Sequence, residues 1–65
     1  MYKKLETQIA YRGISKKQLA VDINMKYSTF LEKMSGKSKF TLDEAVRIKE
    51  YLQEDIAIEE LFKEN

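Results

Sequence analysis

Residues 15–36, SKKQLAVDINMKYSTFLEKMSG, constrain the fold more than any other segment of the chain. Ser15 is suited to cap a helix start, because its hydroxyl can accept a hydrogen bond from a backbone N–H of the first turn. Gln18 follows at the spacing of a capping box, and Ile14 and Leu19 are placed as the hydrophobic staple around it. A helix is therefore predicted to begin at about residue 15.

The end of this helix and the helix after it also have sequence signals. Asn24 is the residue after glycine that best tolerates a left-handed backbone, so the chain can turn sharply there. A second segment places Phe30 and Met34 four residues apart, on one face of a helix. Gly36 is suited to end that helix. Two helices joined by a tight turn within about 20 residues form the helix-turn-helix pattern.

Several positions between residues 13 and 42 follow a known motif: Gly13, Ile14, Ser15, Leu19, Ala20, Ile23, Thr29, Phe30, Met34, Gly36 and Lys37. They resemble the helix-turn-helix of small bacterial and phage repressors, the lambda-repressor/Cro-like (XRE) family. The chain departs from the family pattern at Lys16, usually a phosphate-contacting Gln, at Asn24, usually Gly, and at Lys26, usually a Ser or Thr cap. The resemblance extends more loosely over nearly the whole chain. It implies one all-α, compact five-helix domain over residues 1–65.

Helical patterns also precede and follow this motif. Residues 2–12 are predicted to form a first helix with Leu5 and Ile9 on one stripe, and Gly13 is predicted to end it. Thr41 and Glu44 make a second capping box, from which a fourth helix runs to about residue 53. Its expected buried face is Leu42, Ala45, Ile48 or the stem of Lys49, and Leu52. A short fifth helix is expected to place Ile58, Leu61 and Phe62 together and to close the core against the first or fourth helix.

Composition excludes several classes of protein. The 65 residues include no cysteine and no histidine, which removes disulfides, Cys/His zinc sites and the commonest nucleophile–base pairs. Nothing suggests a catalytic cleft, so we expect no enzyme activity, and no metal, cofactor or small-molecule ligand is implied. No apolar run approaches the roughly 20 residues of a membrane span, and the N-terminus lacks the apolar region of a signal peptide. We therefore expect a cytoplasmic location and no membrane association.

Charge is divided unevenly along the chain. The net charge is +1, but residues 1–39 have nine Lys and Arg against three acids, whereas residues 40–65 have three against eight. The two parts thus differ, at +6 and −5. Such a chain can present one face to phosphate while its total charge stays near neutral. The alternative is a mixed solvated surface that happens to be uneven.

The resemblance implies which residues meet DNA. In this motif the second helix enters the major groove. The positions expected to read bases are Tyr27, Ser28, Leu31 and Glu32, with Leu31 suited to a thymine methyl and Glu32 to a cytosine amino group. Two alternatives stay open: Glu32 pairs with Lys33 or a neighbouring base, and the Tyr27 ring packs on the preceding helix.

Five lysines are expected to contact phosphate: Lys16, Lys17, Lys26, Lys37 and Lys39. Lys16 and Lys17 lie in the first turn of the first helix of the pair, where backbone N–H groups favour an anion. Lys37 and Lys39 lie in the loop after the second helix. These contacts would supply affinity without sequence information. We expect all five side chains to line one side of the domain.

The leading hypothesis is a sequence-specific regulator of transcription that binds double-stranded DNA, a phage or prophage repressor or Cro-like protein. Since one helix reads only about 4–5 base pairs, a homodimer on a pseudo-palindromic operator is implied. The expected dimer surface contains Tyr51, Ile56, Ile58 and Phe62. The alternative is a helix-turn-helix module that binds a protein, such as an antirepressor or toxin-binding partner, and no DNA.

Overall fold

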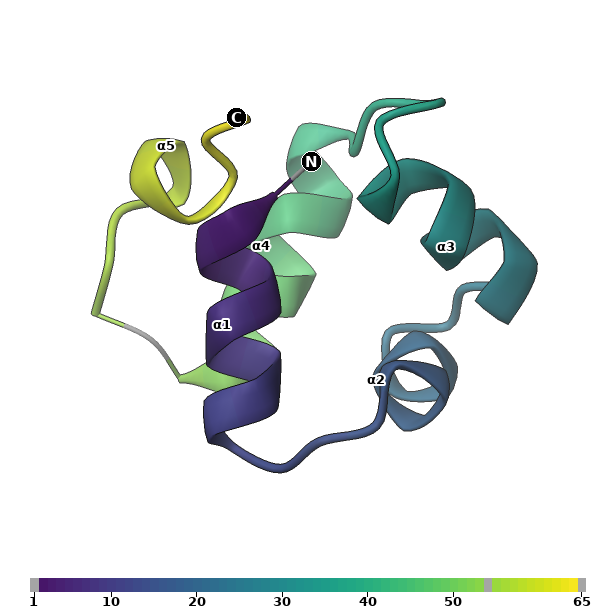
Figure 1. The fold of residues 1–65 in the computed structure, drawn as a ribbon, viewed down its shortest axis with the longest axis horizontal. Helices are drawn as coiled ribbons and strands as arrows, with labels where there is room; N and C mark the ends of the chain where they lie inside the picture. Colours follow the sequence, from purple (N-terminus) through teal and green to yellow (C-terminus); the bar gives the residue numbers. More distant parts are fainter. Residues whose placement is uncertain (1, 54, 65) are drawn as a thin grey trace.

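A computed structural model describes residues 2–53 and 55–64, and within these ranges it contains five helices and no strand. The helices are α1 (Lys3–Tyr11), α2 (Lys16–Asp22), α3 (Tyr27–Met34), α4 (Leu42–Leu52) and α5 (Ile58–Leu61). Figure 1 shows α1 and α5 on one side of the molecule, α2 and α3 on the other, and α4 behind and between them. The predicted all-α architecture of five short helices around one core is confirmed.

Three successive helices end in the same backbone motif. Gly13, Asn24 and Gly36 follow the ends of α1, α2 and α3 and have positive φ values of 66°, 62° and 92°. After α2, for example, the Met25 N–H donates to the Ala20 carbonyl at 2.8 Å. This is the hydrogen bond of a Schellman motif that joins residues five positions apart. The left-handed residue lets the chain leave the helix while its last carbonyls keep partners. These three predicted helix ends are confirmed.

The two predicted capping boxes differ in the structure. The Thr41 hydroxyl accepts from the Glu44 N–H at 3.1 Å, and the Glu44 carboxylate accepts from the Thr41 N–H at 2.9 Å, so this box is complete. The Ser15 hydroxyl accepts from the Gln18 N–H at 2.9 Å. The Gln18 side chain, however, donates to Asp22 at 2.9 Å, one turn further on. Ser15 therefore caps α2 as predicted, but only half of that box is formed.

The hydrophobic core contains residues from all five helices. Its buried side chains are Tyr2, Leu5, Ile9, Leu19, Ala20, Ile23, Phe30, Met34, Ile48, Leu52 and Leu61. Leu61 is fully buried although α5 is a single turn, and α5 packs against both α1 and α4. Phe62 is half-buried against the same core. The predicted role of the fifth helix in closing the core is confirmed.

One expected core residue is exposed. Leu42 keeps 72% of its surface accessible, so its predicted burial is wrong. It is the first residue of α4, directly after the cap Thr41. Phe40, on the loop before the cap, fills this end of the core instead, with its ring packed edge-on against Tyr2 and Phe62 at centroid distances of 5.3 and 5.2 Å. The buried face of α4 consists of Ala45, Ile48 and Leu52.

Candidate nucleic-acid interface

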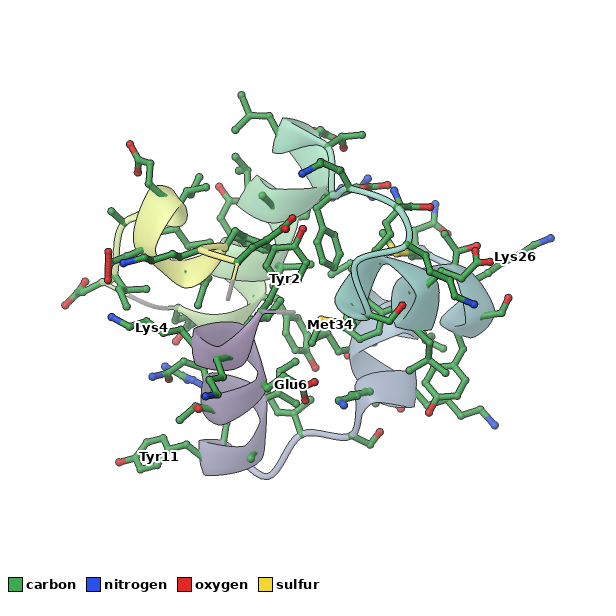
Figure 2. All side chains as sticks on the ribbon, turned by 45° about the horizontal axis from the view of Figure 1, so that its top comes forward. Tyr2, Lys4, Glu6, Tyr11, Lys26 and Met34 are labelled. Atoms are coloured by element: carbon green, nitrogen blue, oxygen red, sulfur yellow. The ribbon has the colours of Figure 1, made fainter. Side chains whose placement is uncertain are left out.

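The α3 helix has one buried and one exposed face. Phe30 and Met34 are 0% and 3% exposed, and Figure 2 shows Met34 directed into the body of the molecule. The four residues predicted to read bases are all exposed: Tyr27, Ser28, Leu31 and Glu32. Tyr27 and Leu31 keep 42% and 39% of their surface accessible. The amphipathic pattern thus gives α3 an anchored side and an accessible side that contains both polar and apolar groups.

One alternative for Glu32 is removed by the position of Lys33. The Lys33 ammonium lies 2.6 Å from the Glu44 carboxylate of α4, and the two side chains are only 13% and 17% exposed. Lys33 therefore does not pair with Glu32. Among the described residues, none donates a hydrogen bond or an ion pair to the Glu32 carboxylate. Glu32 is left available for a partner outside the chain.

The start of α3 has no side-chain cap. Lys26 occupies the N-cap position with an extended backbone, and its side chain makes no capping hydrogen bond. This agrees with the sequence, in which a lysine stands where a capping hydroxyl is usual. Figure 2 shows Lys26 pointing outward, away from the side of the molecule that contains Lys4 and α1.

The α4 helix fixes the position of the α2–α3 pair through polar contacts. One Arg47 nitrogen donates to the Ile23 carbonyl at 2.7 Å, at the C-terminus of α2, while another pairs with Asp43 at 3.1 Å. The Tyr51 hydroxyl donates to the Asp22 carboxylate at 2.6 Å, and this hydrogen bond raises the pKa of Tyr51. The Asp43–Arg47 pair has the i,i+4 spacing of neighbours on one helix face. The contacts to α2 were not predicted, because no local pattern signals them.

Glu44 joins α3 to the start of α4. Its carboxylate accepts from the Lys33 ammonium and from the Thr41 N–H. Burial raises the pKa of Glu44, but the hydrogen bonds from Lys33 and Thr41 outweigh this effect, so the pKa is lowered overall. The charged form of Glu44 is therefore favoured in the folded state, and it holds the last turn of α3 against α4.

The five lysines predicted to contact phosphate fall into two groups. Within the described part of the chain, no carboxylate lies within ion-pair distance of Lys17, Lys26 or Lys37. Lys16 and Lys39 do have such partners. These two partners, Glu6 and Glu64, lie outside α2 and α3. The structure thus leaves three lysines unpaired, all of them in α2, at the start of α3 or directly after α3.

The four residues predicted to form a dimer surface do not all lie in one place. Ile58 and Phe62 line an open groove of about 380 Å³, and Leu42 lies in the same wall. Ile56 is half-buried against the core. Tyr51 does not line this groove, because its hydroxyl is bonded to α2. The exposure of Leu42, which the sequence did not predict, gives the groove an additional apolar side chain.

Metal-ligand clusters and membrane-spanning helices are both absent from the described residues. These residues contain no group of three or more His, Cys, Asp or Glu side chains placed to hold a metal ion. No helix formed by residues 2–53 or 55–64 is long and apolar enough to cross a membrane.

Comparison of the chain with protein-family models, with curated proteins and with solved structures finds no match.

Proposed function

We propose that the chain is a sequence-specific regulator of transcription that binds double-stranded DNA, with the exposed face of α3 in the major groove. The observation that carries this proposal is the two-sided character of α3. Its buried Phe30 and Met34 hold the helix firmly, and its exposed face combines Ser28, Glu32 and Leu31. A helix fits the major groove, where hydrogen bonds and methyl contacts distinguish the base pairs.

Each exposed residue suits a particular contact. Ser28 can donate to or accept from a base edge, Glu32 can accept from the amino group of cytosine, and Leu31 can pack on a thymine methyl. Tyr27, in the first turn of α3, can add a hydroxyl donor at the groove edge. The lysines in α2, at the start of α3 and directly after α3 that have no carboxylate partner among the described residues would contact phosphates on either side of the groove and set the register of the helix. Lys16 and Lys39 would join them after leaving their carboxylate partners.

A homodimer on a pseudo-palindromic operator is part of the proposal. In Figure 1, α5 lies on the opposite side of the molecule from α3, and the groove lined by Leu42, Ile58 and Phe62 includes α5. Contact between two copies across this region would leave both α3 faces free. To bind one operator, the two-fold axis of the dimer must also bring both exposed α3 faces to the same side, about 34 Å apart along the duplex.

The test begins with selection of bound duplexes from a random DNA library, followed by titration of variants against the selected site and a scrambled one. Glu32→Ala and Ser28→Ala should each reduce the difference in binding free energy between the selected and the scrambled site by about 1–3 kcal/mol. The salt dependence of binding should change little. Glu59 is an exposed acid on α5, and Glu59→Ala is the control. It should leave the free-energy difference between the two sites unchanged. Lys17→Ala should weaken both affinities alike and reduce the slope of log K against log salt by about 0.9.

A second function is favoured by two observations. Tyr27 and Leu31 are large apolar side chains exposed on the same face, and two of the five lysines have internal carboxylate partners. Both would suit a surface that binds a protein. If the random library yields no enriched duplex, the proposal of sequence-specific DNA binding is refuted; if the chain is also not retained on heparin, binding of a protein partner by the α3 face takes its place.

A further inference from the structure

Two lysines assigned to phosphate are held by carboxylates from distant parts of the chain. The Lys16 ammonium at the start of α2 lies 2.8 Å from the Glu6 carboxylate of α1. The Lys39 ammonium lies 3.3 Å from the carboxylate of Glu64, which also accepts from the Tyr2 hydroxyl at 3.1 Å. Each pair brings an acid from outside the α2–α3 unit to a lysine that is predicted to contact phosphate.

We infer that Glu6, and more weakly Glu64, act as internal competitors of DNA phosphate and so limit the affinity of the proposed interface. This inference rests on the proposed DNA-binding function and concerns the regulation of the same site. A lysine has one compact ammonium group, and a phosphate oxygen and a carboxylate oxygen occupy it in the same way. Although the ammonium has three N–H donors, the Glu6 carboxylate offsets its single positive charge and repels a nearby phosphate, so Lys16 attracts phosphate less strongly while Glu6 holds it.

The surroundings of the two pairs indicate which competitor is stronger. The side chains of Lys16 and Glu6 are 36% and 33% exposed, so this pair is partly shielded from water. Lys39 is 84% exposed and its pair is longer, so water and salt screen it more. The Tyr2 hydroxyl and Lys39 both lower the pKa of Glu64, which keeps that carboxylate charged. Glu6 should dominate the competition.

The five lysines should consequently contribute unequally to binding. Lys17, Lys26 and Lys37 have no carboxylate partner among the described residues, so each should release about 0.9 counterion per phosphate contact. Lys16→Ala should weaken duplex binding less than Lys17→Ala does, because Glu6 already offsets much of the charge that Lys16 offers to a phosphate. Lys16 and Lys17, neighbours in the first turn of α2, would then contribute differently to DNA binding because the Glu6 carboxylate of α1 pairs with Lys16 alone.

The experiment removes the competitor and keeps the shape. Glu6→Gln should tighten duplex binding about two- to fivefold at low salt, the range expected for loss of a partly exposed ion pair. Glu50→Gln makes the same change of charge at an exposed acid of α4 whose carboxylate has no partner among the described residues, and it should have a smaller effect. In a Lys16→Gln background, the gain from Glu6→Gln should fall by at least half. Thermal unfolding of each variant checks that the fold is unchanged.

Elution from heparin keeps this inference separate from the proposed function. Glu6→Gln should elute at higher salt than Glu50→Gln, whether or not a specific duplex is bound, because heparin also presents oxyanions to the lysines. Equal elution of the two variants, or an undiminished gain in the Lys16→Gln background, would overturn the inference and leave the DNA proposal intact. A chain that shows the heparin difference but enriches no duplex would refute the proposed function alone.

Discussion

The core contact that closes the domain can be tested at Leu61. This residue is 0% exposed and lies in α5, a helix of four residues that packs on α1 and α4. A single helical turn has no independent stability, because nucleation fixes several residues for one hydrogen bond. Burial of Leu61 therefore holds α5, and with it the neighbouring Ile58 and Phe62, in place.

The expected effect of Leu61→Ala is large for so small a domain. Replacing a buried leucine by alanine costs about 2–5 kcal/mol, from lost transfer energy and the cavity that remains. A 65-residue domain is expected to have a free energy of unfolding of about 3–10 kcal/mol. A loss near 3 kcal/mol would lower Tm by roughly 12–24 °C. If the wild type is at the lower end of that range, the variant will be partly unfolded at room temperature.

Urea unfolding followed by far-UV circular dichroism measures this loss, since the signal comes from the helices. The chain offers a matched control in Leu42→Ala, the same chemical change at a side chain that is 72% exposed. That variant should stay within about 0.5 kcal/mol of the wild type. If the two variants lose similar stability, or if Leu61→Ala loses less than about 1 kcal/mol, α5 does not close the core and the packing argument fails.

Two further predictions concern the α2–α3 unit. Asn24→Gly should raise the free energy of unfolding by about 0.5 kcal/mol and Asn24→Ala should lower it by about 1 kcal/mol, because the backbone there has a φ of 62° that glycine adopts freely and alanine does not; urea titration measures both. Glu44 has a lowered pKa in the folded state, so its contribution to stability is present above its unfolded pKa and is lost as the pH falls through the lowered value. Glu44→Gln should therefore be less stable than the wild type at pH 7 and should approach it at low pH in thermal scans; parallel pH profiles would contradict the assigned role.

The polar contacts of α4 set the orientation of both α2 and α3. Arg47 and Tyr51 bind the end of α2, and Glu44 binds the end of α3, so one helix sets the orientation of the two-helix unit. A reading helix must be held rigidly to distinguish base edges that differ by a single donor or acceptor. In the proposed function α4 supplies that rigidity without contacting DNA.

Local signals in the sequence were sufficient for the helices and their ends. Ser15 and Thr41 cap helices, and Gly13, Asn24 and Gly36 end them, because these interactions join residues only three to five positions apart. The exposed face of α3 was predictable for the same reason. The helical period of 3.6 residues puts Phe30 and Met34 on one face, and the remaining positions then face away from it. What each of these residues does depends on its own neighbourhood in the chain, so the amino-acid sequence alone determined them.

Contacts between helices were decided only by the tertiary structure. Arg47 binds a carbonyl 24 residues away and Tyr51 a carboxylate 29 residues away, and neither pairing has a spacing that a sequence pattern reveals. Leu42 fits the apolar pattern of α4, yet it is exposed because Phe40 covers that end of the core. The sequence predicts that Lys16 is available to phosphate, but in the folded chain the Glu6 carboxylate of α1 lies beside it. These outcomes depend on how the helices cross, which is set by the packing of side chains from all five helices together.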